Sequence, residues 1–274
     1  MTQAFDQVLF SGGGIRCFWH GGFLCEVGSF DDLRPERITG VSGGVLSAAT
    51  WIGGREQDLL DVMSEAFALN DSNLDRNKSN FTPHQEIYRA VVDVTLDAEA
   101  IERIADGPVF EAGLSVPPQG LPPHLAAVFY GAFYQLDQAV RGVPHLRLPM
   151  MAGLQQLRVD AREAARQGKL VDLICAAATI PPVFDVPVWN DCRVLDGGMT
   201  DKVLLPEQDE GETLVLLTRQ YRNLSELGDR TYVQPSEEVA ADKIDFTDAS
   251  KVTRTWEQGE RDGKAWLAQQ EASG

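Results

Sequence analysis

The pattern of apolar and polar positions along the chain predicts strands that alternate with helices. Short, mostly apolar runs bounded by glycine or polar turns predict strands at residues 7–10, 37–41, 109–115, 193–195 and 213–218. Helical patterns follow the first two runs and reach Leu24 and Ile52, and residues 160–178 also have a largely helical pattern. Apolar strands joined by long helical connections favour parallel pairing in a covered sheet. We therefore predict a three-layer α/β/α fold with a mainly parallel central sheet.

Residues 117–157 combine several prolines with an aromatic-rich apolar run at 125–134. The run is too short to span a bilayer, which takes about 20 residues. Two interpretations remain open for it: a lid or cap insertion that opens on lipid, or a buried core helix. Residues 249–272 predict a closing amphipathic helix that is interrupted near Gly259 and Gly263.

Residues 40–44, Gly-Val-Ser-Gly-Gly, match the G-x-S-x-G pattern of a nucleophile elbow. Gly40 and Gly44 allow a strand to turn sharply into a helix, which presents the Ser42 hydroxyl at the carboxyl end of the strand. The predicted strand before this turn and the predicted helix after it supply that context. Taken alone, the five residues are equally compatible with a plain tight turn.

A glycine-rich loop at residues 11–16 follows the first predicted strand. The backbone N–H groups of Gly12, Gly13 and Gly14 can converge on one anionic point at a helix start, where the helix dipole favours negative charge. Cys17 stands where G-x-G-x-x-G requires its last glycine, and no P-loop lysine follows. The loop therefore suits a transient oxyanion better than the phosphate of a nucleotide.

Asp196, Gly197 and Gly198 follow the predicted strand 193–195. The two glycines permit a close approach of this backbone to the elbow. The alternative is a hairpin turn, in which such residues are common. The catalytic interpretation depends on the presence of the other two glycine motifs in the same chain.

Together these motifs resemble those of the patatin-like phospholipases, a family of lipid acyl hydrolases. The family has a G-G-G-x-R/K loop after its first strand, then a G-x-S-x-G elbow, then a D-G-G/A loop far downstream, and all three occur here in that order. Residues 176–184 resemble the small-residue helix and proline turn that precede the family's aspartate loop. The chain departs from the family at Cys17, where glycine is common, and at 201–203, Asp-Lys-Val, where an asparagine is frequent.

A serine hydroxyl needs a base to take its proton, and water must then open the acyl intermediate. All four histidines precede Asp196 in the chain, so that aspartate cannot complete the Ser…Asp…His order of α/β-hydrolases. They are His20, His84, His124 and His145, and His20 is the best placed for a triad because it follows the oxyanion loop. The more economical prediction is a dyad in which Asp196 acts directly on Ser42. Arg16 either orients the loop or meets a lipid phosphate.

The chain has 41 acidic and 24 basic residues, which gives a net charge of −17. This surplus opposes nucleic-acid binding and, at long range, anionic lipid surfaces. The four cysteines have no metal-site spacing and are expected to be reduced and buried, and we expect neither metal nor cofactor. With no signal-like amino terminus and no apolar run of bilayer length, we expect a cytoplasmic protein that contacts membranes or micelles only transiently.

Ser42 and Asp196 must meet, so residues 1–274 are predicted to form one domain that includes 117–157. We expect a carboxylic ester hydrolase of the phospholipase A or lysophospholipase type, with a phospholipid or lysophospholipid as substrate. Two alternatives stay open: a catalytically silent lipid-binding or regulatory protein of the same fold, and an acyltransferase. The intact serine and aspartate argue against a silent protein, whereas the sequence does not separate water from an alcohol as the acyl acceptor.

Overall fold

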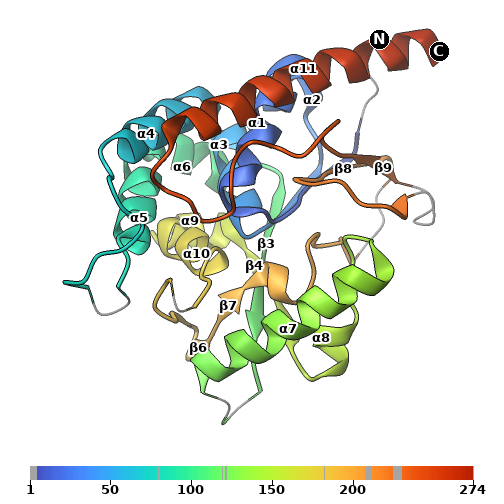
Figure 1. Ribbon diagram of the computed structural model, residues 1–274. Coiled ribbons are helices and arrows are strands. Elements are labelled where there is room, and N and C mark those ends of the chain that lie inside the picture. The colour runs from blue at the N-terminus through green and yellow to red at the C-terminus, as the bar shows by residue number, and fades with distance from the viewer. Residues whose placement is uncertain are drawn as a thin grey trace.

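A seven-stranded sheet forms the centre of the protein in the computed structural model, which describes residues 5–78, 81–118, 120, 122–181, 183–207, 211–224 and 230–273 (Figure 1). The strand order is β4-β3-β2-β1-β8-β9, and β7 pairs with β3. The pairs β1–β2, β1–β8, β2–β3 and β8–β9 are parallel, whereas β4 and β7 run antiparallel to β3. The strands are β1 (Gln7–Phe10), β2 (Arg37–Val41), β3 (Val109–Val116), β4 (Gln155–Asp160), β7 (Leu195–Asp196), β8 (Thr213–Leu216) and β9 (Thr231–Val233).

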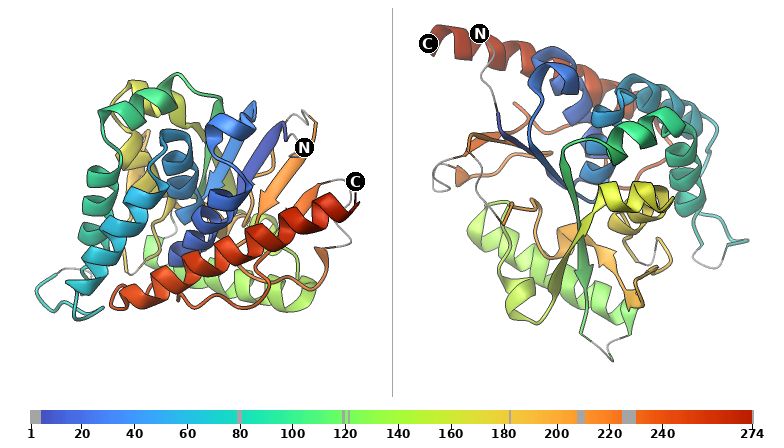
Figure 2. Two further views of the ribbon diagram at one scale, coloured as in Figure 1. Left: turned by 90° about the horizontal axis from the view of Figure 1, so that it is seen from above. Right: turned by 180° about the vertical axis from the view of Figure 1, so that it is seen from behind.

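Helices flank this sheet, as Figures 1 and 2 show. They are α1 (Phe18–Val27), α2 (Phe30–Leu33), α3 (Gly43–Gly53), α4 (Glu56–Ala68), α5 (His84–Thr95), α6 (Ala98–Ala105), α7 (Pro123–Arg141), α8 (Leu148–Met151), α9 (Ala161–Arg166), α10 (Leu170–Ala177) and α11 (Ala249–Ser273). Two short 3-10 turns, η1 (Gly14–Cys17) and η2 (Gly197–Met199), follow β1 and β7. The predicted α/β fold with a mainly parallel central sheet is confirmed.

Strand β1 is buried along its whole length because both faces of the sheet are covered. Val8 and Phe10 belong to the large core that the helices share, whereas Leu9 points to a smaller cluster with Val203 and Val215. Burial on both faces explains why such strands are continuous apolar runs in the sequence. Because β1 and β2 are parallel neighbours, the glycine loops that follow them emerge at the same edge of the sheet.

Helix α11 is continuous, so the predicted interruption near Gly259 and Gly263 is wrong. The two glycines serve close packing instead. A Cβ placed on Gly259 would lie 2.8 Å from the Phe23 nitrogen, and one on Gly263 would lie 2.8 Å from the Phe23 carbonyl oxygen. Without these side chains α11 lies directly against the backbone of α1, across one end of the molecule (Figure 1).

Two predictions about strands need correction. Residues 193–195 do not form one strand, because β6 (Cys192–Arg193) pairs with β5 (Val188–Trp189) in a separate hairpin while β7 pairs with β3. Strand β4 includes residues 155–157, which the sequence predicts as the end of a lid or of a buried helix. The cysteine prediction was also partly wrong, since Cys17 is buried but Cys25 and Cys192 are exposed.

The segment 117–157 contains α7 and α8, which lie at the opposite end of the molecule from α11 (Figures 1 and 2), and residues 119 and 121 lie outside the described part. One face of α7 is buried, because Ala126 and Tyr130 pack with Leu154 and Leu195. Its other face carries exposed apolar side chains and is therefore not a core surface. None of the described helices has the length and apolar character that crossing a bilayer requires.

Candidate active site

Ser42 lies at the turn between β2 and α3 with φ of 55° and ψ of −134°, a strained conformation for a residue other than glycine. A Cβ on Gly44 would lie 2.5 Å from the Ser11 carbonyl oxygen, and one on Gly40 would lie 2.8 Å from Val45 Cα. The flanking glycines therefore allow the backbone to fold back closely on itself. This is the sharp strand-to-helix turn that the G-x-S-x-G pattern predicted.

Asp196 lies within hydrogen-bond distance of Ser42. The Ser42 hydroxyl donates to Asp196 Oδ2 at 2.5 Å, and the Gly198 N–H donates to Asp196 Oδ1 at 2.6 Å. Both side chains are buried, each residue being 2% exposed. Gly197 has no space for a Cβ because the Gly113 carbonyl lies against it. The Asp-Gly-Gly segment is thus a buried turn that brings a carboxylate to the elbow.

Ser115 of strand β3 holds the Asp-Gly-Gly turn in place. The sequence pattern did not indicate it as a site residue. The Ser115 hydroxyl donates to the Asp196 carbonyl oxygen at 2.9 Å and lies 3.0 Å from the Thr200 hydroxyl. The Asp196 N–H donates to the Thr179 carbonyl at 2.8 Å. The aspartate backbone is therefore held on both sides.

None of the three described histidine side chains hydrogen-bonds to Ser42. His20 is fully buried, and that burial lowers its pKa to about 3, so the ring is neutral at physiological pH. His145 lies between Asp201 and the Tyr232 hydroxyl, and His84 bonds to the Ile244 carbonyl. The side chain of His124 lies outside the described residues, as does Pro182 of the proline turn.

The glycine loop after β1 packs directly against the elbow, since a Cβ on Gly12 would lie 3.0 Å from Ser42 Cβ. The Gly12 N–H donates to the Lys202 carbonyl at 2.9 Å, so the prediction that it is an oxyanion donor needs correction. Gly13 lies against Thr218, whose hydroxyl donates to the Gly12 carbonyl at 3.0 Å. Gly14 has a φ of +59° and begins η1. The amides of Gly13 and Gly14 remain as candidates.

A family model described as Patatin-like phospholipase matches residues 8–207, a range that contains the glycine loop, the elbow and the Asp-Gly-Gly turn. The chain belongs to the patatin-like phospholipase family. This membership supports lipid acyl hydrolysis as the general activity.

A solved structure, VipD from Legionella pneumophila, is similar to this chain with a TM-score of 0.55 and 10% sequence identity. The match covers 97% of this chain and 67% of VipD. At that identity the likeness concerns the fold. No curated protein matches the chain significantly.

In this patatin-like protein the side chain of Arg16 contacts residues 238 and 241. Its Nε donates to the Ala241 carbonyl at 3.3 Å, and its guanidinium lies 3.7 Å from the exposed Glu238. Of its two predicted roles, this geometry favours orientation of the loop. Arg16 connects η1 to the segment that leads into α11.

A small apolar cavity of about 30 Å³ adjoins the elbow, with Gly14 and Gly43 in its wall. The Cys17 thiol also lies there, and its pKa is raised mainly by burial, so it is protonated at neutral pH. The cavity continues between the helices α1, α3 and α4, where its apolar lining includes Phe18, Leu46, Leu59 and Met63.

Proposed function

We propose that the protein hydrolyses carboxylic esters of phospholipids or lysophospholipids through an acyl-enzyme on Ser42. The observation that carries this proposal is the 2.5 Å hydrogen bond from the strained elbow serine to Asp196. In the first step Asp196 accepts the hydroxyl proton while Ser42 Oγ attacks the ester carbonyl. The proton then passes to the leaving alcohol, and Asp196 next takes a proton from the water that releases the fatty acid.

The negative charge on the carbonyl oxygen needs donors that are fixed before the reaction. We assign this role to the amides of Gly13 and Gly14, together with that of Gly43, which follows the nucleophile. Gly43 is the first residue of α3, so its N–H is not used by that helix and the helix dipole favours an anion there. Gly12 is left out because its N–H already bonds to Lys202.

The cavity beside Gly14 and Gly43 is the natural place for the first carbons of the acyl chain, because its walls are apolar. At about 30 Å³ it holds only a small part of a chain. A longer chain would require the flexible Met63 side chain to move.

Product analysis with a defined phospholipid tests this function. We expect release of free fatty acid together with the matching lysophospholipid or glycerophosphodiester, which chromatography resolves. Transfer of the acyl chain to an added alcohol, in place of its release to water, would identify an acyltransferase. No turnover on any ester, with the lipid still bound, would identify a silent lipid-binding protein.

We also propose that the chain is one catalytic domain in which the α7–α8 part of residues 117–157 is the cap of the site. Because Ser42 and Asp196 are buried in this conformation, a substrate can reach the serine only after a neighbouring element moves. Helix α7 packs on the Asp196 turn through Tyr130 and Leu195. Its outer face and α8 offer apolar contacts to lipid: Leu125, Val128, Phe129, Leu136, Val140, Met150 and Met151.

Replacing Val128 and Val140 together with serine tests this cap. Both side chains are more than two-thirds exposed, at 73% and 71%, so folding should not depend on them. We expect hydrolysis of phosphatidylcholine vesicles to fall about tenfold or more, since each lost valine contact with lipid is worth about 1.5–3 kcal/mol. Hydrolysis of a short soluble ester should change less than about twofold.

Leu69→Ser, which alters an equally exposed residue after α4, is the matched control for the valine variant. Equal losses on vesicles and on the soluble ester would contradict the cap assignment.

A further inference from the structure

Two lysines from distant parts of the chain border the glycine loop. The Lys202 carbonyl accepts the Gly12 N–H at 2.9 Å, and the Lys243 carbonyl accepts the Ile15 N–H at 3.3 Å. The side chain of Lys243 passes over Gly14, since a Cβ placed there would lie 3.2 Å from Lys243 Cγ. The loop that faces Ser42 is thus held between these two lysines.

The Lys202 ammonium lies beside the dyad, although the residue is only 5% exposed. A Cβ on Gly198 would lie 2.7 Å from Lys202 Nζ and 2.9 Å from Asp196 Oδ1. Both ammonium groups also contact one aromatic ring of α7. Lys202 Nζ lies 4.4 Å and Lys243 Nζ 5.7 Å from the centre of the Tyr134 ring. The two cations therefore converge on the space between the glycine loop and the cap.

Neither ammonium forms a hydrogen bond or an ion pair within the described residues. The Asp196 carboxylate beside Lys202 is already engaged by Ser42 and Gly198. Lys202 is buried and Lys243 is partly buried. A charge removed from water without a close partner is costly, and two facing cations also repel each other. This concentration of positive charge stands out in a chain with a net charge of −17.

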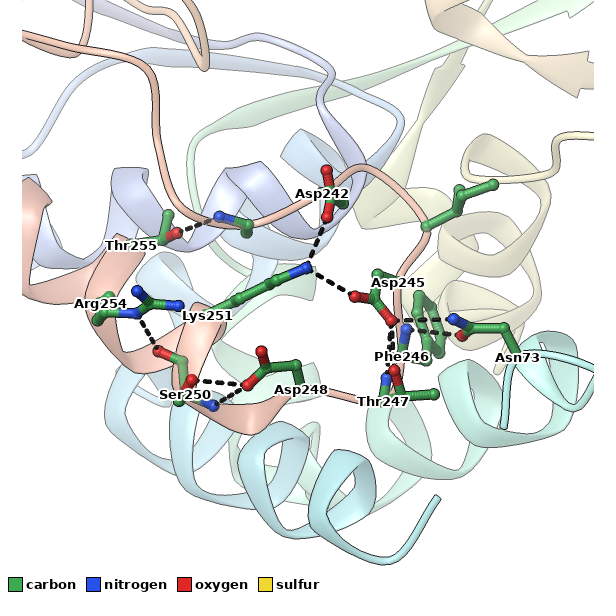
Figure 3. Close-up of polar contacts among 12 residues, drawn as sticks. Asn73, Asp242, Asp245, Phe246, Thr247, Asp248, Ser250, Lys251, Arg254 and Thr255 are labelled. Carbon is green, nitrogen blue, oxygen red and sulfur yellow. Dashed lines mark hydrogen bonds and ion pairs between the residues drawn. The ribbon is translucent and has the colours of Figure 1, made fainter. Parts of the chain in front are cut away.

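The acids next to Lys243 are occupied by another lysine, as Figure 3 shows. Lys251 Nζ lies 2.7 Å from Asp242 Oδ2 and 2.9 Å from Asp245 Oδ2. Asp245 also accepts hydrogen bonds from Asn73 and Thr247, at 2.9 and 2.6 Å. This network fixes the backbone on both sides of Lys243, and among the described residues no carboxylate is left to pair with its ammonium.

We propose that Lys202 and Lys243 form an anion subsite of the active site, which binds the phosphate of a phospholipid or lysophospholipid substrate. The proposal rests on the proposed function and narrows its substrate class. The phosphate of such a lipid is only a few bonds from the scissile ester, and the two lysines lie at the loop that would hold the oxyanion. The bound phosphate supplies the negative charge that the two ammonium groups lack, and the Tyr134 ring covers them in its absence.

The test compares two soluble esters with the same acyl chain, one that carries a phosphoglycerol group and one that does not. Octanoyl lysophosphatidylglycerol and monooctanoylglycerol are assayed below the concentrations at which they form micelles. In the double variant Lys202→Gln/Lys243→Gln we expect kcat/KM for the phosphate ester to fall about 10- to 100-fold, the range for lost charge-assisted hydrogen bonds. For the neutral ester we expect a change of less than about threefold.

Three comparisons make the result specific to the subsite. Lys264→Gln removes an exposed lysine of α11 that pairs with Glu26 and should leave both esters unaffected. The arginine double variant, Lys202→Arg/Lys243→Arg, should recover part of the preference because it keeps the charge. Inorganic phosphate should inhibit hydrolysis of the neutral ester competitively in the parent but not in the glutamine variant.

Equal losses of kcat/KM on both esters would overturn the proposal. If the pH profile of hydrolysis shifted as well, the two lysines would act on the catalytic Asp196 and not on the phosphate. Failure of the proposed function would look different, because the parent would then cleave neither ester. Binding remains measurable in that case. By calorimetry, Ser42→Ala should bind the lysophosphatidylglycerol at least about tenfold more tightly than Ser42→Ala/Lys202→Gln/Lys243→Gln does, and equal affinities would also overturn the subsite.

The subsite also predicts a pH dependence of substrate preference. The pKa of Lys243 is lowered to about 8, first by the positive charge of Lys202 and then by burial, while Arg16 acts in the same direction and Asp196 and Tyr134 oppose it. A lysine is charged below its pKa and neutral above it. The ratio of kcat/KM for the phosphate ester to that for the neutral ester should therefore decline as pH rises through about 8. A ratio that stays flat across this range would count against Lys243.

Discussion

Replacing Ser42 with alanine is expected to reduce phospholipid hydrolysis by about 10⁴-fold or more, to the background of the assay. The alanine has no oxygen that could attack the carbonyl or form the acyl-enzyme. The same change should remove labelling by a fluorophosphonate, which reacts with activated serines. Both effects are measured on one preparation, by fatty-acid release and by in-gel detection of the probe.

Ser64→Ala is the matched control for this loss. Ser64 lies on α4, away from the dyad, and within the described residues its hydroxyl has no hydrogen-bond partner. The control variant should keep full activity and full labelling. If Ser42→Ala were still labelled as strongly as the parent, another residue would be the nucleophile.

Asp196→Asn is expected to lower turnover by about 10²–10⁴-fold, the usual worth of a general base. Asparagine has nearly the same shape and can still accept the Gly198 N–H through its amide oxygen, so the turn should persist. It cannot take the Ser42 proton. Thermal melting near the parent temperature, together with the activity loss, would separate catalysis from folding.

The neighbouring Asp201–His145 pair supplies the controls for that variant. This pair is an acid hydrogen-bonded to an imidazole, with 3.1 Å between Asp201 Oδ2 and His145 Nδ1, but neither residue bonds to Ser42. Asp201→Asn and His145→Gln should each lose less than about tenfold in turnover, because neither removes the proposed base. A folded and inactive His145→Gln with an active Asp196→Asn would assign the proton transfer to the histidine.

The strands that lead into the site could be predicted because burial on both faces leaves a clear signal. Residues 7–10 and 37–41 are mostly apolar runs with glycines close to their carboxyl ends, and the structure places β1 and β2 at those positions. Strand β4 had no such signal, since its sequence, Gln-Gln-Leu-Arg-Val-Asp, is partly exposed at the edge of the sheet. Its pairing with β3 is a tertiary contact that the local pattern does not contain.

The residues of the candidate site also fall into those that the sequence predicts and those that it does not. Ser42 and Asp196 can be found in the sequence because glycines stand next to each of them. These glycines are needed where the backbone turns sharply or passes close to another segment. Lys202 and Lys243 lie in loops without a pattern, and their place beside the dyad depends on how β8, α7 and α11 pack. The hydrogen bond that occupies the Gly12 N–H could not be predicted either, because its partner lies far along the chain.

Mass spectrometry of the parent protein, quenched in acid during turnover of a phospholipid, tests the acyl-enzyme most directly. An acyl-enzyme on Ser42 predicts a peptide that contains this residue and carries the mass of the substrate's acyl chain, and the adduct should be absent from Ser42→Ala. An acyl adduct on a different residue, or steady hydrolysis with no adduct on Ser42 at any quench time, would contradict it.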